Sequence, residues 1–133
     1  MHKKTIPYKD WLPAITPEKV FSDVVGFSEI KVVKNKVYWL ELRPSEKGRY
    51  VVVMMDEQGK IKDITPKEFN ARTRVHEYGG GSYTVNEESV FFTNFQDQRV
   101  YKQKADGSSK PISLTPAKNK DGSLGKYAHF QIA

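Results

Sequence analysis

The stretch "KVYWLELRPSEKGRYVVVMMDEQGKIKDITP", residues 36–66, alternates strand-like segments with turns. Its valines, tyrosines and tryptophan favour strands, while Pro44 and Gly48 interrupt them. With the short segment that precedes the stretch, the predicted strands are "EIKVV" (29–33), "KVYWLELR" (36–43), "RYVVVMM" (49–55) and "KIKDIT" (60–65). The pattern predicts an up-and-down antiparallel sheet whose last strand is shorter and more polar.

The same four-strand pattern returns in the second half of the chain. There the predicted strands are "GSYTVN" (81–86), "SVFFTNF" (89–95), "RVYKQKA" (99–105) and "PISLT" (111–115). The tripeptides "ITP" and "LTP", at 64–66 and 114–116, close the two halves. A repeat of about 40 to 50 residues that carries four strands is typical of a β-propeller blade.

The predicted fold class is therefore all-β, with antiparallel four-stranded propeller-blade sheets and a short N-terminal helix. The helix is expected from about Pro17 to Val25, with Thr16 as its N-cap. The expected parts are an N-terminal extension (1–28), a first blade (29–66), a linker with a second blade (67–116), and a loop with the first strand of a third blade (117–133). A plain β-sandwich with strands of similar length is the alternative.

The composition excludes several classes of function. The 133 residues carry a net charge of +6, but their lysines are scattered and form no basic stripe, so we expect no nucleic-acid partner. Cysteine is absent, which removes disulfides and thiolate catalysis. The N-terminus lacks the apolar core of a secretory signal, and no apolar run spans a bilayer. We expect a cytoplasmic protein with no membrane partner and no cofactor.

The run "RVHEYGGGSY", residues 74–83, holds three consecutive glycines. It lacks the spaced lysine of a phosphate-binding loop, and a strand rather than a helix follows it. We predict that these glycines bend the backbone tightly into the second blade. His76 and Glu77 are adjacent, so on an extended chain they point to opposite faces and form no acid–base pair.

No catalytic group and no metal site is predicted, because no nucleophile–base pair is present and His2 and His129 show no ligand spacing. Four residues close to the glycine run are candidates for contact with a peptide or a partner domain: Arg72, Arg74, His76 and Glu77.

Four stretches of the sequence carry a specific resemblance to a known protein family. They are "YKDWLPAITPEKV" (8–20), "VYWLELRPSEKGRYVVV" (37–53), "DITPKEFNARTRVHEYGGGSYTV" (63–85) and "VFFTNFQDQRVYKQ" (90–103). In this order they resemble the N-terminal propeller portion of the prolyl oligopeptidase family of serine peptidases, in particular its dipeptidyl aminopeptidase/acylaminoacyl-peptidase-like bacterial members. Leu12 and Ala14 depart from the family pattern, and His129 stands where the family tends to have Asp.

The resemblance implies a parent enzyme in which the propeller restricts peptide access to a C-terminal α/β-hydrolase domain with a Ser–Asp–His triad. No serine of this chain is flanked as G-x-S-x-G, so no catalytic residue is transferred, and the chain is expected to be inactive alone.

Two other hypotheses stay open. The chain could be a standalone interaction module that self-associates through its open sheet edges, or a small basic nucleic-acid binder whose affinity depends on salt.

Overall fold

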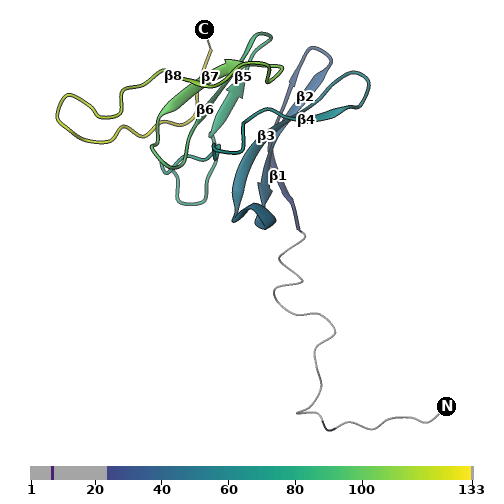
Figure 1. Cartoon of the computed structure of the whole chain (residues 1–133), viewed down its shortest axis with the longest axis horizontal. Helices are drawn as coiled ribbons and strands as arrows, with labels where there is room; N and C mark the ends of the chain where they lie inside the picture. The colour runs from purple at the N-terminus through teal and green to yellow at the C-terminus, as the bar shows by residue number, and fades with distance from the viewer. Residues whose placement is uncertain (1–6, 8–23, 133) are drawn as a thin grey trace.

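The computed structural model describes residue 7 and residues 24–132, and these form two antiparallel sheets of four strands each (Figure 1). The first sheet contains β1 (Gly26–Val33), β2 (Lys36–Arg43), β3 (Arg49–Met55) and β4 (Ile61–Asp63). The second contains β5 (Tyr83–Val85), β6 (Ser89–Thr93), β7 (Val100–Lys104) and β8 (Ile112–Ser113). In each sheet the strands lie in chain order, which confirms the predicted all-β class and the repeated blade-like sheet.

The predicted strands agree with the observed ones most closely in the middle of the first sheet, where β2 and β3 have the expected bounds. The last strand of each sheet is shorter than expected, and β1 begins at Gly26, earlier than expected. The loop after β2 contains a 3-10 turn at Pro44–Glu46. No helix in the described part of the chain is long and apolar enough to cross a membrane.

Two expectations at the ends of the chain have different outcomes. Most of the helix expected from about Pro17 to Val25 lies outside the described residues, and its last two residues belong to no helix or strand. The expected first strand of a third blade is not formed, since residues 127–132 belong to no strand. A strand needs a ladder of backbone hydrogen bonds, and this segment instead makes one such bond to the glycine run, from the His129 N–H to the Gly81 carbonyl (2.9 Å).

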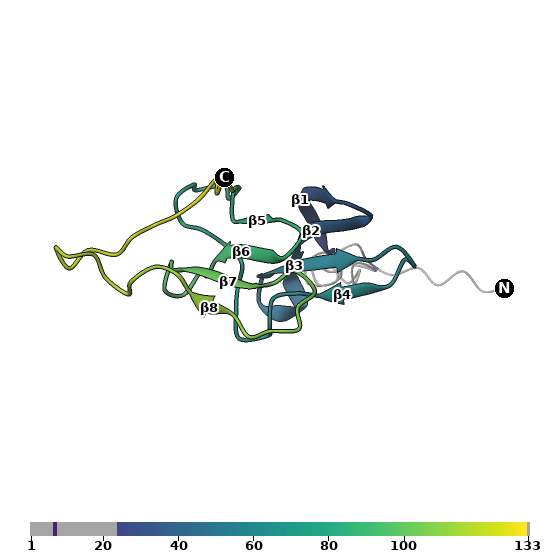
Figure 2. The same ribbon diagram turned by 90° about the horizontal axis from the view of Figure 1, so that it is seen from above.

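The core lies between the two sheets, which sit side by side in both ribbon views (Figures 1 and 2). Strand residues alternate between faces, and one face of each sheet turns toward the other sheet. The buried cluster takes Tyr38, Leu40, Val52, Met54 and Ile64 from the first half, and Ala71, Tyr83, Val85, Val90, Phe92 and Ala105 from the second. Burying one large apolar side chain stabilises a fold by about 1.5–3 kcal/mol, so this shared core joins the sheets.

The linker between the sheets adds polar contacts to both of them. Asn70 is central: its side-chain oxygen accepts a hydrogen bond from the Tyr50 N–H (3.0 Å), and its own N–H donates to the side chain of Asn94 (3.1 Å). The Asn70 carbonyl accepts from the Phe95 N–H (2.8 Å). Backbone groups removed from water need partners, and this single residue supplies them to both sheets.

An ionic network joins two strands on the far side of the first sheet. The Arg43 guanidinium donates to both carboxylate oxygens of Asp63 (2.6 Å each) and to Glu41 (2.7 Å). It therefore links β2 to β4, although these strands are not neighbours in the sheet. The hydrogen bonds from Arg43 hold the pKa of Asp63 below its ordinary value.

We predict that Asp63→Asn reduces the acid sensitivity of the fold. Because the pKa of Asp63 is lowered by folding, its stabilising contribution is complete above the ordinary aspartate pKa of about 3.9, and is lost as the pH falls through the folded value. In urea unfolding at a series of pH values, the wild-type midpoint should therefore fall more steeply below about pH 4 than that of the variant. Identical pH profiles would contradict this role for Arg43.

Candidate ligand-binding site beside the glycine run

The three glycines all adopt the left-handed backbone that the sequence suggested. Their φ angles are 82° at Gly79, 107° at Gly80 and 66° at Gly81, a region that side chains with a Cβ rarely occupy. Gly81 also lies against the C-terminal segment: a Cβ built there would stand 2.8 Å from the His129 backbone nitrogen. The prediction that this run bends the chain into the second sheet is confirmed, since β5 begins two residues later.

A cavity of about 280 Å³ opens where this run meets the first sheet. Its lining comes from β1, β2 and β3 and from the segment that leads into β5: Ser28, Glu29, Leu40, Tyr50, Arg72, Tyr78, Gly79, Gly80 and Ser82. The first sheet and the segment that joins the two sheets therefore form one concave site together.

Glu29 enters this site through an irregularity in β1. The pairing of β1 with β2 shifts register between Ser28 and Lys31, and Glu29 has a φ of 52°, which is uncommon for a residue other than glycine. The second sheet stabilises this conformation. The Ser82 N–H donates to the Glu29 carboxylate (3.2 Å), and the Tyr83 hydroxyl donates to the Glu29 carbonyl (2.5 Å). Burial, together with the nearby Glu29 charge, raises the pKa of Tyr83, so this phenol stays protonated.

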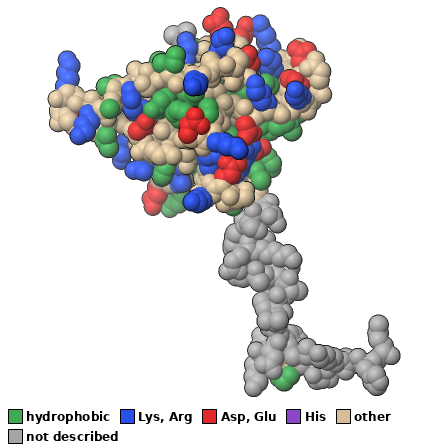
Figure 3. Space-filling model, in the orientation of Figure 1, with side chains coloured by type: hydrophobic (Ala, Val, Ile, Leu, Met, Phe, Trp, Pro, Cys, Tyr) green, Lys and Arg blue, Asp and Glu red, His purple; other side chains and the backbone are tan. Residues whose placement is uncertain are grey.

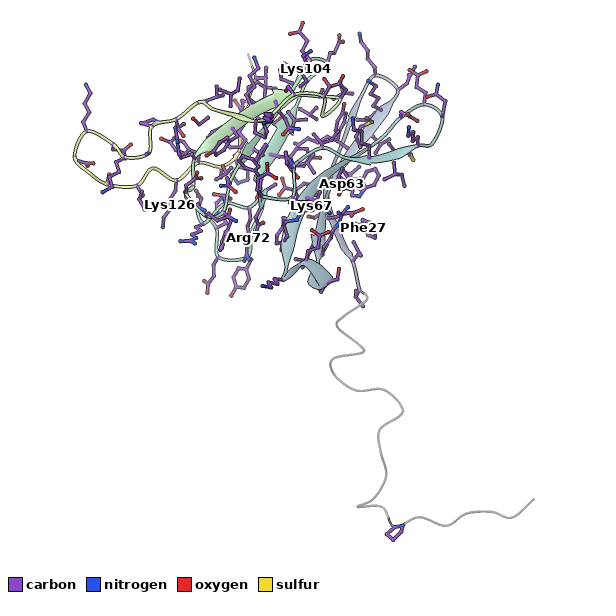
Figure 4. All side chains as sticks on the ribbon, viewed as in Figure 1. Phe27, Asp63, Lys67, Arg72, Lys104 and Lys126 are labelled. Carbon is purple, nitrogen blue, oxygen red and sulfur yellow. The ribbon has the colours of Figure 1, made fainter. Side chains whose placement is uncertain are left out.

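Arg72 and Arg74 are held by aromatic rings. The Arg72 guanidinium lies 5.4 Å from the Tyr50 ring centroid and 5.2 Å from that of Phe95, and Arg74 lies 4.3 Å from the same Phe95 ring. Such cation–π contacts orient the guanidinium while leaving its N–H groups free to bind an anion. Of the two arginines, Arg72 lines the cavity; Figure 4 shows it at the end of the sheets away from Lys104.

His76 and Glu77 lie outside the lining of the cavity. Both are exposed, and the His76 Nε2 lies 2.8 Å from the Nε2 of His129. The sequence analysis set His129 aside because it shows no ligand spacing, so this contact was missed. The described residues contain no group of three or more potential ligands that could hold a metal ion.

The cavity brings together polar groups of different kinds. It combines a carboxylate, a guanidinium and the phenol of Tyr78, whose side chain is fully open to solvent. Ser82 is buried and its hydroxyl accepts a hydrogen bond from the Thr73 N–H (3.4 Å). Within the described part of the chain, no serine is hydrogen-bonded to a histidine, so no nucleophile–base pair is assembled there.

The sequence analysis identified Arg72 as a candidate contact residue. It did not identify Glu29, Tyr50 or Tyr78, which also line the cavity. Glu29 was taken as the first residue of an ordinary strand, and the register shift that exposes its carboxylate leaves no mark in the sequence. Tyr50 was predicted only as part of the strand at residues 49–55. Tyr78 belongs to the run "RVHEYGGGSY" and had a usable signal, because binding residues are often carried on loops.

Three solved structures of peptidases are similar to this chain. The structure of a Mycobacterium tuberculosis puromycin-hydrolyzing peptidase matches 87% of this chain with a TM-score of 0.71 and 37% sequence identity. The crystal structure of puromycin hydrolase matches 86% of the chain, with a TM-score of 0.71 and 30% identity. A puromycin hydrolase mutant complexed with PGG matches 84%, with a TM-score of 0.72 and 31% identity.

This chain spans 18% of the length of each of these peptidases. No family model and no curated protein matches it. Both the TM-scores and the sequence identities confirm the resemblance that the sequence motifs indicated. The chain is similar to the propeller portion of peptidases of the prolyl oligopeptidase family.

We predict that Gly81→Ala destabilises the protein more than Gly79→Ala. Both substitutions force alanine into a left-handed backbone, which costs about 1–2 kcal/mol. Only at Gly81 does the added Cβ also collide with the backbone of another segment, whereas nothing lies within 4 Å of the Cβ position at Gly79. Thermal unfolding of the two variants beside wild type measures the difference. Equal losses of stability would contradict the close approach of residues 81 and 129.

Proposed function

We propose that this chain is the first two blades of the propeller of a serine peptidase of the prolyl oligopeptidase family. In that protein it limits the access of peptides to an α/β-hydrolase domain that carries the catalytic triad. The observation that supports this proposal is the match to puromycin-hydrolysing peptidases at 30–37% identity, over less than a fifth of their length. The chain has a cavity lined by charged and aromatic groups but no G-x-S-x-G motif of its own.

The ligands that fit this role are short peptides and aminoacyl compounds. In the cavity, the Arg72 guanidinium suits a carboxylate and the Glu29 carboxylate suits an ammonium group, the two charged ends of a free peptide. An acylaminoacyl, dipeptidyl or oligopeptide substrate is consistent with these groups. Puromycin, named for the similar structures, is a reasonable probe of the whole protein. The proposal keeps the cytoplasmic location expected from the sequence.

We predict that a short unblocked peptide binds this chain at the cavity and that Arg72→Ala weakens binding about tenfold, as loss of a charge-assisted hydrogen bond does. Titration followed by NMR chemical shifts gives both the site and the dissociation constant. Arg74→Ala is the matched control, because Arg74 stacks on the same Phe95 ring without lining the cavity. Equal effects of the two substitutions would contradict a binding role for the cavity.

We also predict that the 133-residue chain leaves aminoacyl and acyl-aminoacyl anilides intact. The described residues hold no serine hydrogen-bonded to a histidine, so the rate should equal that of buffer. Labelling by a fluorophosphonate probe is the more sensitive readout, because it reports an activated serine even when turnover is slow. A labelled serine would contradict the proposal that catalysis belongs to another domain.

A further inference from the structure

Two histidines that lie 53 positions apart in the sequence meet beside the glycine run. The Nε2 atoms of His76 and His129 are 2.8 Å apart, and their ring centroids are 4.8 Å apart with the ring planes at 65°. Both residues are exposed, and neither lines the cavity. Neutral imidazole is the commonest metal ligand among side chains. The pair therefore presents two donor atoms at one point of the surface, and the proposed peptide-binding role uses neither of them.

The backbone of His129 is held in a conformation that histidine seldom adopts. Its φ is 54°, in the left-handed region. The His129 N–H donates to the Gly81 carbonyl (2.9 Å). Two residues earlier, the Tyr127 carbonyl accepts from the hydroxyls of Thr73 (2.7 Å) and Thr93 (2.9 Å). Such uncommon backbone persists only where the surroundings hold it, and it is concentrated at functional sites.

The glycine run makes room for the imidazole of His129. A Cβ built on Gly81 would stand 2.7 Å from the His129 Nδ1 and 2.9 Å from its Cε1, so a side chain at this position would displace the ring. His76 is fixed from the other side, because its carbonyl accepts from the Gly79 N–H (3.2 Å). The Thr73 hydroxyl oxygen also accepts from the Val75 N–H (3.2 Å). Thr73 is thus bound to both of the segments that carry the histidines.

The separation of the two nitrogens suits a metal chelate. Bonds from imidazole nitrogen to a metal ion are about 2.0 Å long, so two bonds at a right angle place the nitrogens about 2.8 Å apart. A tetrahedral angle would place them about 3.3 Å apart. The observed 2.8 Å fits the right angle, which is typical of tetragonal ions such as Cu²⁺ and Ni²⁺.

The proton between the two rings does not prevent this chelate. The two Nε2 atoms share a hydrogen bond, so one ring donates and the other accepts. A neutral imidazole can carry its proton on either nitrogen. An ion that takes the place of the hydrogen bond moves that proton to the Nδ1 of the same ring, and both Nε2 lone pairs then face the ion with no proton released.

We propose that His76 and His129 form a binding site for a divalent transition metal ion with tetragonal coordination. Among first-row ions, Cu²⁺ is bound most tightly by such ligands. Two protein ligands leave coordination positions for water or for a donor atom of another molecule. A bound ion links the C-terminal segment to the glycine run, two residues of which line the cavity.

The inference is independent of the proposed peptidase role. Both imidazoles are placed by hydrogen bonds within residues 73–129, so the pair does not depend on an uncovered side of either sheet. The metal site goes beyond the peptide-binding cavity, since it uses different side chains.

Carboxylates elsewhere on the described surface are weaker candidates for a cation. Glu57, Glu87 and Glu88 line a hollow of about 350 Å³. Two of them already have partners, since Glu87 pairs with Lys34 (2.6 Å) and Glu57 accepts from the Asn35 side chain (3.3 Å). On the face of the molecule in Figure 3, acidic and basic side chains are interspersed rather than gathered by sign. The histidine pair is therefore the better-defined site.

The first test is calorimetric titration of the full chain with CuCl₂. The third histidine, His2, follows the amino terminus and can chelate Cu²⁺ together with the terminal amine, so every measurement uses the His2→Ala background. We expect one Cu²⁺ per chain. Adding His76→Ala or His129→Ala should each weaken binding at least about tenfold, because the second imidazole binds the ion intramolecularly. Mg²⁺, which prefers oxygen ligands, should give no binding.

The second test examines how the ring of His129 is positioned. Gly81→Ala should weaken Cu²⁺ binding, because the added Cβ collides with this ring, whereas Gly79→Ala is the matched control with a left-handed backbone and open space. Thermal unfolding establishes that both variants are folded at the titration temperature. Electron paramagnetic resonance of the Cu²⁺ complex should show a tetragonal ion coupled to two imidazole nitrogens.

Three results would overturn the proposal. The first is no Cu²⁺ binding by the His2→Ala chain. The second is binding that neither His76→Ala nor His129→Ala weakens, which indicates an ion held elsewhere. The third is binding that only one of these substitutions weakens, with coupling to a single nitrogen, which indicates an adventitious ion on one exposed imidazole.

Discussion

The structure depends on one constraint: a four-stranded sheet with an apolar face is stable only when that face is covered. Here the cover is the other sheet, through a core that includes Tyr38 and Phe92. The linker around Asn70 is bound to both sheets for the same reason, since its backbone groups are removed from water by the contact it spans. The cavity is a further result of this packing, because its Glu29 and Arg72 sides come from different halves of the chain.

The repeated four-strand pattern allowed the fold to be predicted from the sequence. Strands β2 and β3 were predicted with the correct bounds. In residues 36–55 the strand-favouring residues and the interruptions at Pro44 and Gly48 all indicate the same strand ends. The candidate site was predicted only in part. Arg72 was found because it carries a charge beside a distinctive motif. Glu29, in contrast, reaches the cavity through a register shift in β1. His129 contacts His76 only because folding brings distant parts of the chain together. Tertiary contacts of this kind leave no local pattern. The strand expected within residues 117–133 is likewise not formed among the described residues, because local propensity does not supply a pairing partner.

The cavity and the outward sides of the sheets have different chemistry. The cavity presents a carboxylate, a guanidinium and an exposed phenol on rigid backbone, which suits small charged ligands. On the outward sides of the sheets, apolar side chains are exposed on the edge strands, at Phe27, Ile61 and Ile112. A propeller portion needs both kinds of surface, since its blades must contact neighbours while the ends of the sheets remain open to ligands. The similarity to puromycin-hydrolysing peptidases at 30–37% identity fits this division.

The most direct test of the proposed function is to read the gene downstream of the codon for Ala133. The account predicts that the reading frame continues through further four-strand repeats and into a hydrolase domain with a G-x-S-x-G motif. A stop codon directly after Ala133, with no hydrolase sequence following in frame, would contradict the assignment of this chain as the propeller portion of a peptidase.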